Sequence, residues 1–133
     1  MSESSPVTRY DPFDGALSLS LATKAGGFVY TSGMLGTDAQ FNVPADVEEE
    51  FRLVFSQLGG ILEAMDTSFA HVIEMTNFFA GDFEAVYPTF NKVRAEVFGQ
   101  NFPASTSVRV AQLLHPSAHV EVKMIAALPG TAV

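Results

Sequence analysis

The chain has 133 residues, a length that fits one domain with its own hydrophobic core, and we take residues 1–133 as that single domain. Fifteen acidic residues against seven basic ones give a net charge of -8, which opposes nucleic-acid binding because that binding needs Lys and Arg at the phosphates. The sequence has no cysteine, which excludes disulfides and thiolate chemistry, and no apolar run near the ~20 residues of a membrane span, so we expect a cytoplasmic protein without a membrane partner.

The first predicted elements are a loose start and a hairpin. Residues 1 to about 14 are polar and interrupted by two prolines, which predicts a segment that is loose or lies along the surface. Leucines alternate with polar residues over 17–23, a turn with two glycines follows at 24–27, and residues 28–32 have the composition of a strand. Gly33 and Gly36 come next, and Gly in a strand pattern indicates a bulge or a close backbone approach.

A long helix is predicted between residue 44 and about residue 65, where apolar residues recur at steps of three and four. Glu48, Glu49 and Glu50 lie in its first turns, where the helix dipole favours acidic groups. We interpret them as a solvated helix start rather than as metal ligands. The Gly59-Gly60 pair costs about 1 kcal/mol per Gly relative to Ala, which a close-packing contact would explain.

The second half of the chain predicts a strand, a helix and two more strands. Residues 71–79 form the strand, and Asp82 is the predicted N-cap of a helix over about 83–98 that Gly99 ends. Two segments of period 2 follow, at 105–110 and 120–125. The order of elements predicts an α+β domain, with a mixed sheet and both helices on one face. A chain this short has no third layer, so we expect another copy of the chain to cover the other face.

Polar side chains gather on the last two predicted strands. Strand spacing puts Ser105, Ser107 and Arg109 on one face of the first strand, and it puts Glu121 and Lys123 on one face of the second. We expect part of any chemical site there. Arg109 is a candidate for substrate binding, although it lies about 13 Å along the strand from Ser105, and its alternative is a surface or subunit contact.

Several motifs of this chain resemble those of the Rid family, also called YjgF, RidA or L-PSP proteins. They are YTSG at 30–33, VPAD at 43–46, FPAS at 102–105, VRVA at 108–111 and the closing VEVKMIAAL at 120–128. The resemblance implies a chorismate-mutase-like α+β fold and a homotrimer with clefts between neighbouring subunits. It also implies hydrolysis of reactive enamines and imines, such as 2-aminoacrylate, to a carbonyl compound and ammonia without metal or organic cofactor.

The same resemblance shows where the chain departs from the family. In archetypal members FPA is followed by an Arg that clamps the substrate carboxylate, and Ser105 holds that position here. The family's Cys two residues later corresponds to Ser107, its pocket tyrosine aligns near Leu19, and its strand glutamate corresponds to Lys123. The chain therefore resembles a divergent branch that lacks the carboxylate-binding Arg.

The remaining residues leave two roles open for each catalytic candidate. Lys123 acts as a base if it is desolvated, or it stays charged and binds an anion, which we favour. Glu121 takes part in catalysis or pairs with Lys123, and both are alternatively exposed residues of a solvated sheet. Ser105 and Ser107 are candidate donors to a substrate oxygen, and Tyr87, early in the second helix, is a candidate pocket residue.

The sequence thus predicts a homotrimeric, cytoplasmic hydrolase that deaminates a small enamine or imine. A metabolite-sensing or protein-binding trimer that has lost hydrolysis is the alternative. Ribonuclease activity has been attached to the family, but it conflicts with the acidic balance. His71, His115 and His119 fit no zinc-binding spacing, so we expect no metal.

Overall fold

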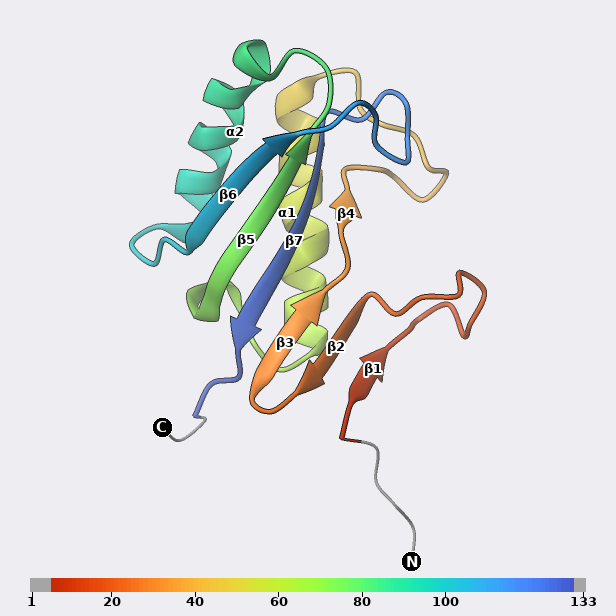
Figure 1. Cartoon of the computed structure of the whole chain (residues 1–133), viewed down its shortest axis with the longest axis vertical. Coiled ribbons are helices and arrows are strands. Elements are labelled where there is room, and N and C mark those ends of the chain that lie inside the picture. Colours follow the sequence, from red (N-terminus) through yellow and green to blue (C-terminus); the bar gives the residue numbers. More distant parts are fainter. Residues whose placement is uncertain (1–5, 131–133) are drawn as a thin grey trace, which may run out of the picture.

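A computed structural model describes residues 6–130 and shows a sheet of seven strands. The strands are Thr8–Tyr10 (β1), Ala22–Ala25 (β2), Phe28–Thr31 (β3), Met34–Leu35 (β4), Val72–Phe79 (β5), Ala104–Arg109 (β6) and Val120–Ala127 (β7). Their hydrogen-bonded order is β1-β2-β3-β7-β5-β6, with β4 also paired to β7 (Figure 1). β5 and β6 are parallel and the other pairs are antiparallel, which confirms the mixed sheet.

Two helices, Val47–Ala64 (α1) and Phe83–Phe98 (α2), lie side by side behind the sheet (Figure 1). A short 3-10 turn, Phe69–His71, precedes β5. Each helix turns an apolar stripe of period 3.6 toward the sheet, so the core fills the space between the layers. Phe90 of α2 lies at its centre and contacts the rings of Phe51, Phe55 and Phe79. The prediction that both helices cover one face is confirmed.

The helix ends follow from local sequence signals. Asp46 and Asp82 are the N-caps, and each side chain accepts a hydrogen bond of 3.2 Å from the backbone N–H three residues later. Gly99 ends α2 with a φ of 61°. The expected close contact at Gly59 is also present, because a Cβ there would lie 3.0 Å from the ring of Phe69.

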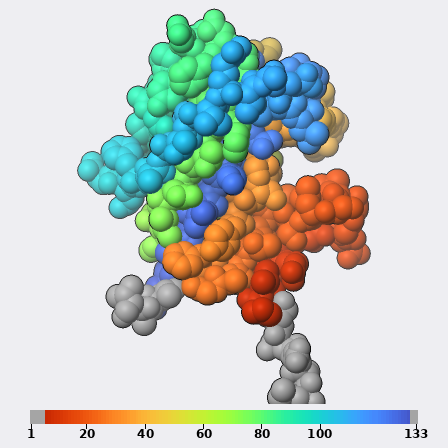
Figure 2. Space-filling model, viewed as in Figure 1, coloured from red at the N-terminus to blue at the C-terminus, as the bar shows by residue number. Residues whose placement is uncertain are grey.

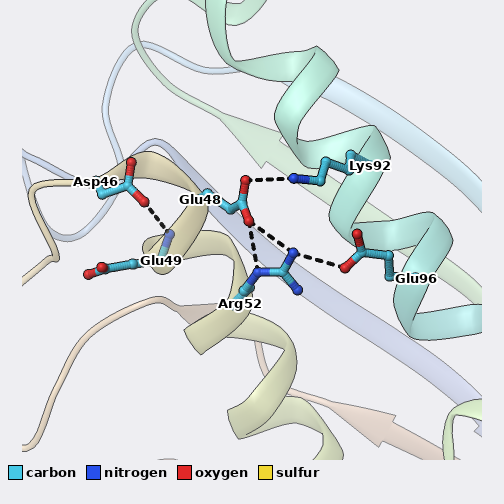
Figure 3. A network of polar contacts seen from close by, with 6 residues as sticks. All are labelled: Asp46, Glu48, Glu49, Arg52, Lys92 and Glu96. Carbon is cyan, nitrogen blue, oxygen red and sulfur yellow. Dashed lines mark hydrogen bonds and ion pairs between the residues drawn. The ribbon is translucent and has the colours of Figure 1, made fainter.

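Exposed charges link the two helices (Figure 3). Glu48 accepts hydrogen bonds from Lys92 of α2 at 3.0 Å and from Arg52 at 2.9 Å, and Arg52 also pairs with Glu96 at 2.8 Å. Lys92 first, and then Arg52, hold the pKa of Glu48 below its ordinary value. We call these four residues the interhelix network.

The N-terminal part of the chain differs from the prediction. Residues 8–10, expected to be loose, form β1 and pair with β2, while residues 1–5 of that prediction lie outside the described residues. The first strand of the hairpin is residues 22–25 rather than 17–21. The tight turn at Gly26 and Gly27, with φ of 60° and 87°, sets this register and opposes Ala22 to Thr31, so Leu17 and Leu19 lie beyond the pairing and are exposed.

Glu50 is not solvated, contrary to the prediction for the start of the first helix. Its side chain is fully buried, and its carboxylate accepts the backbone N–H of His119 at 2.7 Å and lies 2.7 Å from Nδ1 of the same residue. The reason is tertiary, because the residue that precedes β7 comes to lie against the first turn of α1. A Cβ at Gly36 would overlap the backbone of Glu50, so Gly36 permits the close approach of its own segment to α1.

Within residues 6–130, no helix or further strand covers the sheet face away from the helices (Figure 2). Figure 2 shows atoms of β3, β5, β6 and β7 at the surface on this side. The strand register places five large apolar side chains on this open face: Phe28, Tyr30, Phe78, Val108 and Ile125. Within residues 6–130, neither helix has the length and apolar character needed to cross a membrane.

Candidate functional site

The edge strand β6 carries the first group of candidate residues. Ser105, Ser107 and Arg109 lie opposite Met75, Asn77 and Phe79 of β5, which are buried on the helix side of the sheet. This register confirms that the three candidates share a face, and it shows that the face is the one toward α2. All six residues of β6 are exposed, so their side chains are open to a ligand or to another subunit.

Asn77 of the neighbouring strand β5 orients Ser105 and Ser107. Its side chain is fully buried, and its Nδ2 donates to Ser105 Oγ at 2.9 Å and to Ser107 Oγ at 3.1 Å. Asn77 Oδ1 has no hydrogen-bond partner within the described part of the chain. Both hydroxyls therefore act as acceptors toward Asn77, which leaves their own O–H groups to donate elsewhere.

Arg94 of α2 lies directly beside Ser105, although sequence reasoning did not find it. Its Nη1 donates to Ser105 Oγ at 3.0 Å, and its Nη2 donates to Tyr87 OH at 2.9 Å and to Asn91 Oδ1 at 2.7 Å. The guanidinium carbon is 5.6 Å from the ring centre of Tyr87 and 5.4 Å from that of Phe90. These contacts hold the guanidinium against Ser105, the residue that corresponds to the family's arginine. The signal for it was the spacing of Tyr87, Asn91 and Arg94 at i, i+4 and i+7, which places them on one helix face.

A small crevice opens next to this guanidinium. Its volume is about 210 Å³, and its wall consists of Asn91, Arg94, Ala95, Phe102, Pro103 and Ser105. No carboxylate within residues 6–130 pairs with Arg94, whose partners there are all neutral oxygen atoms. The crevice therefore combines an unpaired cation with apolar walls, which suits a small anion.

Arg109 occupies a different place. Its Nε donates to the carbonyl of Gly81 at 2.9 Å, and it lies in a hollow with Asp82 and Glu84 at the other end of β6. The side chain is thus engaged by the loop before α2. It does not share a crevice with Ser105.

The second group of candidates lies on the open face. Glu121 of β7 is opposite Phe78 of β5 and Leu35 of β4, and it is half-buried. This burial raises the pKa of the Glu121 carboxyl above its ordinary value. A Cβ at Gly33 would overlap the carboxyl group, so this glycine leaves room for the Glu121 side chain.

Lys123 follows on the same face, opposite Thr76. The register confirms that Glu121 and Lys123 share a face, but the described residues contain no ion pair between them. Lys123 is exposed, and no hydrogen bond to its side chain occurs within residues 6–130.

The two groups of candidates do not meet within one chain. Ser105 and Glu121 belong to strands separated by β5 and differ by three residues in register, so their Cα atoms are roughly 14 Å apart. Their side chains also point to opposite faces of the sheet. A small metabolite cannot touch both in one protomer.

Two of the three histidines, His115 and His119, make local structural contacts. His119 pairs with Glu50, and the ring of His115 lies 5.0 Å from that of Phe41. Residues 6–130 contain no cluster of three or more His, Cys, Asp or Glu side chains that could hold a metal ion.

Comparison with known proteins places this architecture in a family. The sequence model described as Endoribonuclease L-PSP matches residues 12–128. A 2-iminobutanoate/2-iminopropanoate deaminase of Dermatophagoides farinae is 32% identical over 108 residues, covering 80% of this chain and 82% of the relative. The 3-aminoacrylate deaminase RutC of Acinetobacter baylyi is 34% identical over 114 residues, covering 79% and 82%. The crystal structure of E. coli TdcF with bound serine matches with a TM-score of 0.74 at 28% identity, covering 81% of this chain and 86% of that one.

These matches confirm the predicted fold, which is that of the YjgF and L-PSP proteins. The family match extends over most of the chain, and the relatives above 30% identity are covered over more than two thirds of their length. The chain therefore belongs to the L-PSP family, the proteins also called YjgF or Rid.

Proposed function

We propose that this chain is an enamine and imine deaminase, which hydrolyses a small 2-imino acid to a 2-oxo acid and ammonia. Relatives at 32% and 34% identity are named as deaminases of such compounds, and TdcF is described with bound serine, a small amino acid. The crevice beside Arg94 has the size and charge for a small carboxylate. We place the enzyme in the cytoplasm, as the sequence predicts.

The working form in this proposal is a homotrimer with clefts between subunits. The Ser105 side and the Glu121 side lie on opposite faces of one sheet, so each protomer carries two separate halves of a site. The open face carries five large apolar side chains, and the edge strand β6 is exposed along its whole length. Packing of one protomer's β6 edge over the open face of the next buries apolar surface and joins the two halves.

Glu121 carries the chemical part of the proposal. Its carboxyl is half-buried against Gly33, and burial raises its pKa toward the range in which a general base works. A water molecule held by Glu121 adds to the imine carbon, and its proton passes through the carboxyl group to the imine nitrogen. The carboxyl group then carries the O–H proton of the resulting carbinolamine to its amino group, and the C–N bond breaks to leave a carbonyl group and ammonia.

The other candidates assist in binding. Lys123 stays charged on the open face near Glu121, roughly 7 Å along the strand, and attracts the anionic substrate. Ser107 and Ser105 present O–H groups that their contacts with Asn77 leave free to donate. Tyr87 acts indirectly, because its hydroxyl accepts from Arg94.

The experiment that tests this function compares Glu121→Gln with Glu74→Gln. Glu74 lies opposite Ile125 on the same face and is exposed, so it is a matched control. A 2-imino acid is generated from an L-amino acid by an amino-acid oxidase, and its decay and the release of ammonia are followed. We expect E121Q to lose about 100-fold in kcat/KM, as for loss of a general base, and E74Q to change less than about twofold. Equal rates for wild type and buffer contradict the proposal.

The substitution of Ser105 for the family's arginine favours one second candidate, a trimer that binds a metabolite without hydrolysing it. In that case 2-oxobutanoate raises the melting temperature while the imine decays at the buffer rate. Ribonuclease activity is disfavoured by the net charge of -8.

A further inference from the structure

We propose that Arg94 is the residue that binds the carboxylate of the substrate in this chain. The inference rests on the proposed function, because it identifies the anion-binding half of the same cleft. Although this chain lacks the family's arginine at position 105, its site therefore still contains a cation. The guanidinium comes from helix α2 instead of strand β6.

The first support is position. Arg94 Nη1 is 3.0 Å from Ser105 Oγ, the atom that occupies the place of the first side-chain carbon beyond Cβ of an arginine at this position. The cation therefore lies against the site that the motif FPAS marks in the sequence. It also lines the 210 Å³ crevice, together with Ser105 and the apolar side chains of Phe102 and Pro103.

The second support is the count of hydrogen-bond donors. A guanidinium has five N–H groups, and three of those of Arg94 bond to Ser105, Tyr87 and Asn91. Two therefore have no acceptor within residues 6–130. Ser105 Oγ accepts from both Asn77 and Arg94, so both of its acceptor positions are filled and its O–H must donate. Donors from Arg94 and Ser105 thus converge, and a carboxylate supplies the acceptors that they lack.

The third support is charge. Of the seven cations, all within the described residues, Lys24, Arg52 and Lys92 form ion pairs with carboxylates. Arg94 instead has neutral acceptors and two aromatic rings, although the chain has fifteen acidic residues. Its side chain is held in place before the ligand arrives, which reduces the entropy lost on binding. A rigid, uncompensated guanidinium is suited to an anionic ligand.

The competing cations are less suited to this role. Arg109 Nε is bound to the carbonyl of Gly81 in a separate hollow. Lys123 is exposed on the open face, with no polar contact in the described part of the chain to orient it.

The test compares two imines in wild type and variants. One is a 2-imino acid, and the other lacks a carboxylate and is generated from a primary amine by an amine oxidase. We expect Arg94→Gln to lower kcat/KM for the 2-imino acid about 100-fold, mainly through KM, and to change that for the carboxylate-free imine less than about twofold. Arg94→Lys recovers only part of this loss, because an ammonium cannot bind both oxygens in parallel. Arg52→Gln, with the same change of charge in the interhelix network, serves as the control.

A second set of variants moves the cation. Ser105→Arg combined with Arg94→Gln returns a guanidinium to the crevice from β6, and we expect it to recover at least about tenfold of the lost kcat/KM. Ser105→Arg alone brings two guanidiniums together and gives no gain. Equal losses of R94Q on both imines, a loss in K123Q without one in R94Q, or the lack of recovery in the double variant would overturn the proposal.

Direct binding separates this inference from the proposed function. We expect calorimetry with 2-oxobutanoate, the carboxylate product, to show binding to wild type that is about 100-fold weaker in R94Q. If wild type binds 2-oxobutanoate through Arg94 but hydrolyses no imine, the anion site stands and the enzymatic function fails. If wild type hydrolyses the 2-imino acid and R94Q does so equally well, the function stands and the role of Arg94 fails.

Discussion

Helix α2 has two sides with opposite electrostatics. On the side toward α1, Lys92 and Glu96 join Glu48 and Arg52 in the interhelix network, where each cation meets at least one carboxylate (Figure 3). On the side toward β6, Arg94 is only two residues from Lys92, yet it meets a hydroxyl, a phenol and an amide. The same helix thus places one cation in a compensated network and another without a compensating anion.

The cations on the α1 side of α2 link the two helices, whereas Arg94 on the β6 side is free to bind a ligand. Exposed ion pairs contribute little to stability, but they neutralise one another and leave no field for a ligand. An arginine held by neutral acceptors keeps its full charge and spare donors. Because carboxylates are abundant in this chain, the neutral surroundings of Arg94 indicate a site built for an anion from outside.

The largest loss of activity is expected when the side of α2 toward β6 is given a carboxylate, as the side toward α1 already has. Asn91→Asp replaces the amide oxygen 2.7 Å from Arg94 with a carboxylate of the same shape. The new ion pair neutralises the guanidinium and competes with the substrate, so we expect kcat/KM for a 2-imino acid to fall about 30-fold while the melting temperature stays the same or rises. Gln40→Glu, which adds the same charge on an exposed loop, is the control. Full activity of N91D would contradict the distinction between the two sides.

A smaller effect is expected at the residue beneath the serines. Asn77→Leu removes a buried amide whose Oδ1 has no partner in residues 6–130, and burial of such a group costs about 1–3 kcal/mol. We therefore expect N77L to be as stable as wild type or more stable. Ser105 and Ser107 lose the donor that orients them, so kcat/KM should fall about tenfold.

Urea denaturation and the imine assay measure the two properties of N77L separately. A variant that lost stability and activity together would show that Asn77 is a packing residue and no part of the binding side. The double variant N77L/R94Q distinguishes the two roles of Asn77. If Asn77 is only a packing residue, the losses of kcat/KM in the two single variants add in free energy. If Asn77 and Arg94 both position Ser105, the double variant loses less than that sum.

The sequence predicted both helices and the strands β3, β5, β6 and β7, but it could not predict how their faces combine. The N-caps Asp46 and Asp82 and the stop at Gly99 are local, because each acts on backbone groups within a few residues. Period 2 likewise shows which residues share a face within one strand. It does not relate two strands, so the opposite orientations of Ser105 and Glu121 depend on pairing through β5.

The residues that sequence reasoning missed are those whose partners are distant in the chain. Glu50 is buried because His119, 69 residues later, comes to lie against it. The role of Arg94 depends on which side of α2 packs next to β6, and a helical stripe alone does not determine this. The three residues of β1 pair with β2, which local sequence signals did not indicate.

A smaller effect again is expected for the stability of Glu121→Gln. The pKa of Glu121 is raised by burial in the folded state, so its contribution to stability is full below its unfolded pKa and is lost as pH rises through the folded pKa. E121Q should therefore be the more stable form at pH 7, by less than about 1 kcal/mol because the group is half-exposed, and the difference should vanish below about pH 4. Thermal unfolding from pH 3 to 8 measures it, and a less stable E121Q at pH 7 would contradict the cause assigned to the pKa.

The smallest effect is expected in the interhelix network. Glu48→Gln leaves Lys92 and one side of Arg52 without their carboxylate, but all these side chains are exposed and each cation can be hydrated. The pKa of Glu48 is lowered in the folded state, so its contribution to stability is present above its unfolded pKa and is lost as pH falls through the folded value. Wild type should exceed E48Q slightly in melting temperature at pH 7 in low salt, and the two should converge in 1 M salt or as Glu48 becomes protonated in acid.

The kcat/KM of E48Q should stay within about twofold of wild type, because the network supplies no charge to the crevice. A loss of activity as large as that of N91D would show that the two sides of α2 are coupled.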